Sequence, residues 1–248
     1  MITIKNKAEI ALMREAGRIA AIARQEAVKH VKPGVSTKYI NEIIEKTIIK
    51  HGATCNFKGY GGFPAGACVS VNNELVHGIP GDRILKEGDI VSLDLGCSWK
   101  GYQSDTAITV PVGAIDEESK LLLKVTEEAL YKGLEQAKPD NRIGDISNAI
   151  QTYVESFGFH LPRDYTGHGI GRELHEDPYV PNYGPSGHGP RLREGMAIAV
   201  EPMVQIGTIE TRTQPNGWTV VSKDGSRSAH FEHTIVITDT GYEITTKL

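Results

Sequence analysis

The segment KPGVSTKYINEIIEKTIIKHG, residues 32–52, is matched without a gap by KPDNRIGDISNAIQTYVESFG, residues 138–158. The two copies start at positions 32 and 138, a spacing of 106, and each opens with Lys-Pro and closes with Gly. Both copies carry the same apolar stripe, in which Ile40, Ile44 and Ile48 fall on Ile146, Ile150 and Val154. Apolar residues at this spacing predict an amphipathic helix in each copy.

The correspondence resumes beyond each copy. Leu-Lys-Glu-Gly at 85–88 matches Leu-Arg-Glu-Gly at 192–195, a spacing of 107 from 85 to 192, and Asp94 then falls on Glu201. Because Gly, Pro and acidic residues align together, a duplicated unit is favoured over a chance similarity. We therefore expect a single domain over residues 1–248, built from two halves of about 1–112 and 113–248, with one equivalent carboxylate in each.

The other periodicities predict a mixed α/β chain. Three-and-four spacing of apolar residues indicates helices over 8–31 and 117–138 in addition to the repeated pair, whose second member we place at 143–157. Alternation predicts strands over 90–95, 106–112, 196–201, 218–222 and 231–237. Residues 53–82 are rich in Gly and Pro, which is typical of loops and brief strands.

Composition excludes several functional classes. The 248 residues carry a formal charge of −4, so no global basic field attracts nucleic acid or an anionic membrane. The three cysteines form no C-x-x-C pair, and no stretch approaches the ~18 apolar residues that span a bilayer. The N-terminus lacks the apolar core of a signal peptide. We expect a cytoplasmic protein that binds neither nucleic acid nor membrane.

Two acidic residues occupy strand positions in the first half. Asp94 lies in Val-Ser-Leu-Asp-Leu, residues 91–95, and Asp105 follows a turn near 98–101. If the loop between the strands has an even number of residues, both carboxylates lie on one face as near neighbours. Buried together they require a cation or a proton, whereas on a solvated face they need neither, and this pair alone leaves both readings open.

The second half supplies similar chemistry. Glu201 ends the apolar strand at 196–201, and Glu232 alternates with the apolar residues of the strand at 231–237. Four acids at such positions favour a metal cluster, and an added imidazole favours Mn, Fe(II), Co or Zn over Ca and Mg. The candidate histidines are those in glycine-rich segments, namely His77, His168 and His175.

Other catalytic templates are absent. His175-Glu176 does not begin an H-E-x-x-H helix, because Tyr179 stands at the second histidine position and Pro178 precedes it. No G-x-S-x-G elbow or Walker A loop occurs. Serine nucleophile and phosphate-loop chemistry are therefore not expected.

Six segments together resemble the type 1 methionine aminopeptidase family: Val76-His-Gly-Ile-Pro80, Glu87-Gly-Asp-Ile-Val-Ser-Leu-Asp-Leu-Gly96, Ser104-Asp-Thr, Gly167-His-Gly-Ile-Gly, Val200-Glu-Pro-Met and Phe231-Glu-His-Thr. The resemblance covers essentially the whole chain and is to the short bacterial form, since the interval from His175 to Glu201 leaves no room for the helical insertion of type 2. It implies the α/β (α+β) pita-bread fold, in which two pseudo-symmetric halves form a curved antiparallel sheet covered by helices.

The resemblance also implies a site with two divalent ions. Their ligands would be Asp94, Asp105, His168, Glu201 and Glu232, with Asp105 and Glu232 bridging the ions, Asp94 chelating one, and His168 with Glu201 completing the other. A water or hydroxide between the ions would attack the scissile bond. Glu201 would then move the proton of this water, His175 would stabilise the oxyanion, and His77 would contact the peptide beyond the scissile bond.

The methionine side chain would occupy a pocket formed by apolar and polarisable groups, which the resemblance assigns to Tyr60, Phe63, Cys68 and Trp218. At three positions the sequence departs from residues common in the family. Phe63 stands where Tyr is common, Leu174 where Phe is common, and His230 where Gln is common. These departures concern the pocket rather than the reaction class.

The expected function is removal of the initiator methionine from nascent proteins whose second residue is small. Two alternatives keep the fold: a proline-specific aminopeptidase, whose relatives usually carry an extra N-terminal domain, and a non-catalytic binding module, which would have lost ligands, although none is lost here. The expected partners are N-termini of new polypeptides, and the family expectation is a monomer. The physiological metal and any contact with the ribosome stay open.

Overall fold

A computed structural model describes residues 1–248. It contains four α-helices, α1 Lys7–Lys29, α2 Thr37–Lys50, α3 Glu117–Leu134 and α4 Ile143–Ser156, together with a short 3₁₀ turn, Tyr60–Gly62. The strands are β1 Thr54–Cys55, β2 Ala67–Val71, β3 Glu74–Val76, β4 Ile90–Trp99, β5 Tyr102–Pro111, β6 Gly167–Gly169, β7 Glu176–Val180, β8 Ala197–Val200, β9 Met203–Gln205, β10 Thr211–Thr213, β11 Val220–Ser222, β12 Ser228–His230, β13 Glu232–Ile237 and β14 Tyr242–Ile244.

All four predicted helices are present, and local signals explain their ends. Asn6 caps α1 and Ser36 caps α2, each by accepting hydrogen bonds from backbone N–H groups of the first turn. The helix predicted over 117–138 ends earlier, at Leu134. Pro139 disfavours the helical conformation at the residue before it, so the chain turns ahead of the Lys-Pro pair. No helix is long and apolar enough to cross a membrane.

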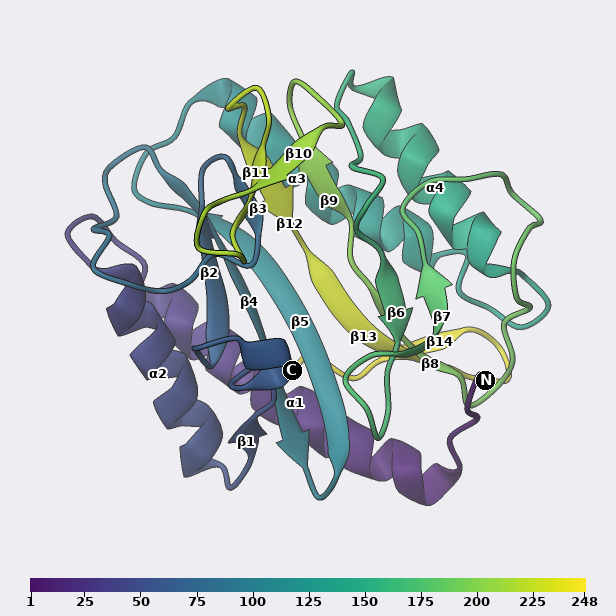
Figure 1. Ribbon diagram of the computed structural model, residues 1–248. Coiled ribbons are helices and arrows are strands. Elements are labelled where there is room, and N and C mark those ends of the chain that lie inside the picture. The colour runs from purple at the N-terminus through teal and green to yellow at the C-terminus, as the bar shows by residue number, and fades with distance from the viewer.

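One antiparallel sheet, whose strands differ in length, forms the centre of the molecule. Its strands follow the order β1-β4-β5-β13-β8-β6-β7, with β2 also paired to β4 and β14 to β13. Outward from the contact between β5 and β13, the order is β4 then β2 on one side and β8 then β6 on the other (Figure 1). The strands β4 and β8 are the two that follow the repeated Leu-x-Glu-Gly segments, so the strand order reproduces the duplication seen in the sequence.

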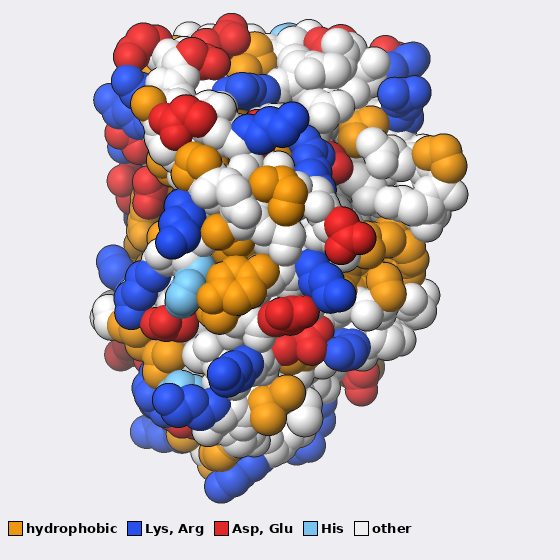
Figure 2. All heavy atoms as spheres, turned by 90° about the vertical axis from the view of Figure 1, so that its left-hand side faces the viewer, with side chains coloured by type: hydrophobic (Ala, Val, Ile, Leu, Met, Phe, Trp, Pro, Cys, Tyr) orange, Lys and Arg blue, Asp and Glu red, His pale blue; other side chains and the backbone are white.

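Each helix pair covers its own part of the sheet. A cluster of 18 buried residues joins α1 and α2 to strands including β2 and β4, and a cluster of 23 joins α3 and α4 to strands including β8 and β13. Figure 1 shows α1 and α2 to the left and below, and α3 and α4 to the upper right, with the long strands between them. On the face turned toward the viewer in Figure 2, basic and acidic side chains are interspersed, with no broad region of one sign.

The β4–β5 hairpin is longer than the sequence predicted. The two strands pair up to Trp99 and Tyr102, so the loop is only Lys100-Gly101. Both loop residues have positive φ, 48° and 81°, as a two-residue type I′ turn requires. The loop is therefore even, and Asp94 and Asp105 lie on one face of the sheet, as expected for that case.

Several short strands were not predicted. The segment Gly167–Gly169, which appears in the sequence as a glycine-rich loop, forms β6, and β7 and β14 also lie outside the predicted strands. Three residues of Gly-His-Gly carry no apolar alternation. Their extended conformation comes from pairing with β8 on one side and β7 on the other, which is tertiary structure.

Candidate metal centre

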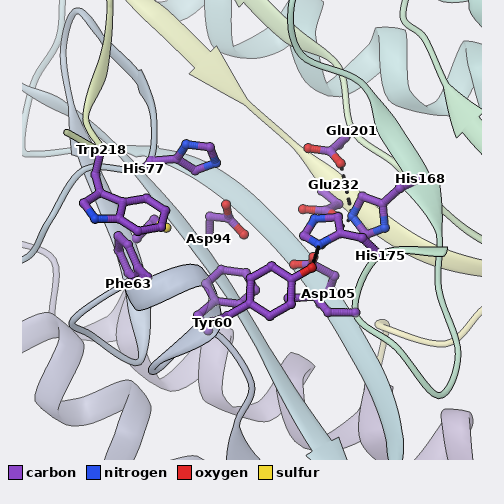
Figure 3. A pocket seen from close by; sticks show the side chains of 13 residues that line it. Tyr60, Phe63, His77, Asp94, Asp105, His168, His175, Glu201, Trp218 and Glu232 are labelled. Carbon is purple, nitrogen blue, oxygen red and sulfur yellow. Dashed lines mark hydrogen bonds and ion pairs between the residues drawn. The ribbon is translucent and has the colours of Figure 1, made fainter. Parts of the chain in front are cut away.

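A cavity of about 220 Å³ opens beside the strands of the long sheet (Figure 3). Thirteen residues line this site pocket, and they include all eleven site residues named from the sequence. The lining is Phe57, Tyr60, Phe63, Cys68, His77, Asp94, Asp105, His168, Leu174, His175, Glu201, Trp218 and Glu232. Trp218 and Phe63 lie at one end of the pocket and Glu201 and Glu232 at the other, with Tyr60 and Asp94 between them (Figure 3).

Strand register explains why three carboxylates meet. Asp94 of β4 is paired with Ala107 of β5, which is also paired with Glu232 of β13. Asp105 lies two residues before Ala107, so its side chain points to the same face. The small side chain of Ala107 leaves room between the acids. Thr234 holds the backbone of Asp105 in place, because its hydroxyl donates to the Asp105 carbonyl (2.7 Å) and accepts from the Asp105 N–H (3.1 Å).

The second half adds two further groups through the same face. His168 of β6 and Thr234 of β13 are both paired with Ala199 of β8, and Glu201 follows two residues later. Period-two alternation places the side chains of His168 and Glu201 on the side of Glu232. Asn182 fixes the end of β8 by donating to the Glu201 carbonyl at 3.0 Å. Each half of the chain thus contributes acids to one pocket.

The polar atoms converge. The Nε2 atom of His168 lies 3.6 Å from Asp105 Oδ2 and 3.5 Å from Glu201 Oε1. Its Nδ1 atom lies 2.9 Å from the Gly169 carbonyl oxygen, an interaction that leaves Nε2 free to face the carboxylates. The ligand atoms of Asp105, His168 and Glu232 all lie within 4.8 Å of one another, a spacing compatible with one shared ion.

Burial makes these carboxylates unstable as a set of charges. Their side chains are almost inaccessible, and Asp94 Oδ1, Asp105 Oδ1 and Glu232 Oε1 are buried without a hydrogen-bond partner. Desolvation and repulsion by the other acids raise the pKa of Asp94 and of Glu232 well above the usual range. Unpartnered oxygens in such a cluster fit a divalent cation, which would neutralise the carboxylates in place of protons.

The pKa of His168 responds to the same cluster of acidic groups. Its burial disfavours the charged form, but the contact with Asp105 and the charge of Glu201 outweigh burial and raise the pKa of His168 to about 9. The raised pKa thus reflects an excess of negative charge around His168. Carboxylate oxygens with one imidazole suit Mn, Fe(II), Co or Zn.

Two further histidines, His175 and His77, lie beside the carboxylates. The ring centroids of His175 and His168 lie 4.1 Å apart with the rings tilted by 54°, and the His175 Nδ1 lies 2.7 Å from the Tyr60 hydroxyl. Burial and the neighbouring His168 lower the pKa of His175 to about 4, so its imidazole is neutral at pH 7. Burial also lowers the pKa of His77, whose ring meets Trp218 edge to face.

The apolar end of the pocket is formed by close aromatic packing. Phe63 and Trp218 meet edge to face with ring centroids 5.2 Å apart, and Cys68 is buried beside Asp94 on the paired strand β2. Two lining residues were not among the predicted site residues, Phe57 and Leu174. Leu174 stood out in the sequence only as a departure from the resembling family, and Phe57 carried no signal beyond its aromatic type.

A third imidazole lies behind the acids. His230, at the end of β12, has Nε2 3.4 Å from Glu201 Oε2 and 3.7 Å from Glu232 Oε2. The ligand atoms of Glu201, His230 and Glu232 form a second set within 4.8 Å. In the sequence, His230 stood out only as a departure from the Gln that is common in the resembling family.

Comparisons with known proteins agree on one family. Residues 11–239 match the profile of metallopeptidase family M24. The chain is 55% identical over 248 residues to methionine aminopeptidase 1 of Bacillus subtilis (strain 168), covering 100% of both chains. It is similar to the crystal structure of methionine aminopeptidase from Thermotoga maritima, with a TM-score of 0.99, 48% identity and complete coverage of both chains.

The fold is shared more widely than the activity. Prolidase from Pyrococcus furiosus superimposes with a TM-score of 0.81 and 25% identity, over 99% of this chain and 65% of that one. These likenesses, together with four helices and antiparallel sheets, confirm the predicted pita-bread fold class.

Proposed function

The chain belongs to metallopeptidase family M24 and lies among its methionine aminopeptidases, and from this premise we propose that it releases the N-terminal methionine of polypeptides whose second residue is small. The observation that carries the proposal is one pocket with two chemically different ends. An apolar end adjoins a cluster of unpartnered buried carboxylates within one pocket of about 220 Å³. Such a pocket suits an exopeptidase that recognises one residue and cleaves beside it.

The apolar end accounts for the choice of methionine. A volume of about 220 Å³ is below the ~300–1,000 Å³ of pockets that hold larger ligands. Phe63, Trp218, Tyr60 and Cys68 offer aromatic and sulfur surface to a thioether, which favours contact with ring edges. Leu174 closes the same end with a side chain that is 4% exposed.

The acidic end would hold two divalent ions. Asp94, Asp105 and Glu232 would bind one ion, and Asp105, Glu232, His168 and Glu201 the other, with Co, Mn, Fe(II) and Zn as the candidates. When bound, such ions lower the pKa of water and polarise a carbonyl group. The buried oxygens without partners are the feature of this chain that supports the assignment.

The remaining steps fall to side chains at the rim of the cluster. Glu201 lies at the pocket surface beside His168 and would accept the proton of the attacking water and pass it to the departing amine. Neutral His175 accepts at Nδ1 when the Tyr60 hydroxyl donates, which leaves a proton on Nε2 for the developing oxyanion. His77 lies beside Trp218 at the other side and would contact the residue after the scissile bond.

Two alternatives are not favoured. A proline-specific aminopeptidase shares the fold, but the prolidase similarity is at 25% identity and spans only 65% of that protein. A binding module without activity would require missing ligands, and all five candidate ligands are present in the pocket. We further propose that the protein acts in the cytoplasm on nascent polypeptides and works as a monomer.

Release of methionine from a short peptide tests the proposal. The protein is freed of metal with a chelator and assayed on Met-Ala-Ser, Met-Leu-Ser and Ala-Pro-Ser before and after addition of Co(II) or Mn(II). We expect methionine from Met-Ala-Ser alone, and only after metal is added. Asp105→Asn and Glu232→Gln should abolish release, whereas Glu194→Gln, at an exposed position, should not. Full release by either ligand variant would contradict the proposal, and cleavage of Ala-Pro-Ser alone would favour the alternative.

A further inference from the structure

We propose that His230 is an additional protein ligand of the ion held by Glu201 and Glu232, so that this ion is bound by two imidazoles rather than one. The inference rests on the proposed metal centre and adds a residue to it. His230 occupies a position where the resembling family commonly has Gln. Its side chain does not line the site pocket and approaches the carboxylates from the buried side.

The first support is that the imidazole of His230 is buried and unsatisfied. The residue is 1% exposed, and neither ring nitrogen has a hydrogen-bond partner. A buried imidazole normally finds a partner for each nitrogen. His233, three residues later, shows the ordinary case, because its Nδ1 lies 2.8 Å from the Thr246 hydroxyl and its Nε2 3.4 Å from that of Tyr131. The ring nitrogens of His230 face carboxylates instead.

The second support is the spacing of those carboxylates. The Nε2 atom of His230 lies 3.4 Å from Glu201 and 3.7 Å from Glu232, close to the 3.5 and 3.6 Å that separate His168 Nε2 from its two acids. Ligand atoms each about 2.1 Å from one ion at a tetrahedral angle lie about 3.4 Å apart. The distances therefore match the edges of a coordination polyhedron and exceed those of direct hydrogen bonds.

The third support is that the backbone of His230 is held in place before any ion binds. Thr109 holds its backbone, since the hydroxyl accepts from the His230 N–H and donates to the His230 carbonyl, both at 2.8 Å. The opposite ring nitrogen, Nδ1, lies 4.0 Å from Asp94 Oδ2. This second carboxylate adds negative charge on the opposite side of the ring, at a distance beyond that of a hydrogen bond.

Binding from the buried side leaves the pocket open. His168 and Glu201 reach the ion from the pocket wall, and His230 from behind the acids, so the additional ligand does not occupy space needed by a peptide. A second imidazole also shifts preference toward Co, Fe(II) and Zn and away from Mn, which favours oxygen ligands.

Paramagnetic proton NMR of the Co(II) protein counts the bound imidazoles. The metal-free protein is loaded with one equivalent of Co(II), and each bound histidine gives a strongly shifted, exchangeable N–H signal. We expect two such signals from the unmodified protein and from His188→Gln, an exposed control, and one signal from His230→Gln. We also expect Co(II) affinity to fall at least about tenfold in His230→Gln, with a smaller loss for Mn(II).

One shifted imidazole signal in the unmodified protein, unchanged in His230→Gln, would overturn the inference and leave the proposed function intact. In that case His230 would only hydrogen-bond to Glu201. The unmodified protein alone decides between one and two signals, so the test stands even if His230→Gln folds poorly. Failure of the unmodified protein to bind Co(II) at all would overturn both this inference and the metal centre on which it rests.

Discussion

At the scale of single residues, the decisive feature is that acids occupy places normally filled by apolar side chains. Asp94, Asp105 and Glu232 are each less than a tenth exposed and lie on one face of three adjacent strands. Unpaired, such a group would cost several kcal/mol. We propose that the same positions that weaken the metal-free fold create the affinity for cations, and that the pocket beside them supplies recognition.

Phe63 tests the recognition half of the pocket. Phe63→Ala removes the ring that packs on Trp218 while leaving every candidate metal ligand in place. We expect kcat/KM for Met-Ala-Ser to fall about 10- to 200-fold, chiefly through KM, with Co(II) affinity unchanged. Phe157→Ala is the matched control at an exposed ring that directly follows α4. An unchanged KM would show that this part of the pocket does not hold the methionine side chain.

The hydrogen bonds of Asp145 predict a contribution to stability that depends on pH. Its carboxylate accepts from the Ser186 hydroxyl, the Gly187 N–H and the Arg142 N–H, and the Ser186 bond is the main cause of its lowered pKa. Because the folded pKa lies below the unfolded value of about 3.9, this stabilisation is present above pH 4 and lost as pH falls through the folded pKa.

Asp145→Asn should therefore lower the free energy of unfolding by about 1–2 kcal/mol at pH 7, and the difference from the unmodified protein should shrink below pH 4. Urea unfolding at several pH values measures this difference. Asp239→Asn, at an exposed position, should have no effect. A difference that persists unchanged at pH 3 would mean that the carboxylate charge is not its source.

At the scale of elements, close contacts between helices and the C-terminal segment hold the sheet in register. A Cβ atom on Gly17, in the middle of α1, would lie 2.2 Å from the Thr245 carbonyl oxygen. Thr245 cannot move freely, since its N–H and hydroxyl both donate to the Thr234 carbonyl. Thr234 in turn clamps Asp105, so packing of α1 is connected to the carboxylate cluster by two contacts.

Gly17→Ala should destabilise the protein by about 1–3 kcal/mol, although alanine has the higher helix propensity, because the clash outweighs the ~1 kcal/mol gain. Gly81→Ala is the control, since its Cβ would meet nothing within 4 Å. It should be neutral or slightly stabilising. Thermal unfolding compares the two variants, and equal stability for both would show that α1 and the C-terminal segment pack less closely than described.

The secondary-structure elements also show which parts of the fold the sequence does not predict. The helices and the long strands follow from period and caps, and the paired acids follow from the repeat. Gly167–Gly169 could not be predicted as a strand, because its extended form depends on β7 and β8. His230 was noted only as an unusual residue, since its distance to Glu201 depends on how β12 pairs with β9, which no local pattern encodes.

At the scale of the whole molecule, two halves with separate helix pairs share one sheet. Ile44 of α2 and Ile150 of α4 are equivalent in the repeat, and each is fully buried in a different core cluster. We propose that residues 1–248 form one cooperative domain, because the β5–β13 contact joins the halves through the strands that carry Asp105 and Glu232.

Ile44→Val and Ile150→Val test this cooperativity. Each should lower the stability of the whole protein by about 0.5–1.5 kcal/mol and shift one common unfolding transition. Calorimetry and circular dichroism should give coincident curves for both variants. A second transition that moves in only one variant would show that the halves unfold independently.

The central claim is that both halves complete one metal centre, and anomalous X-ray scattering tests it most directly. A crystal of the protein loaded with Co(II) is measured on both sides of the cobalt absorption edge. The account predicts anomalous density in the site pocket, between Asp94, Asp105 and Glu232 and between His168, Glu201 and His230. Anomalous density elsewhere on the molecule, with none among these side chains, would contradict it.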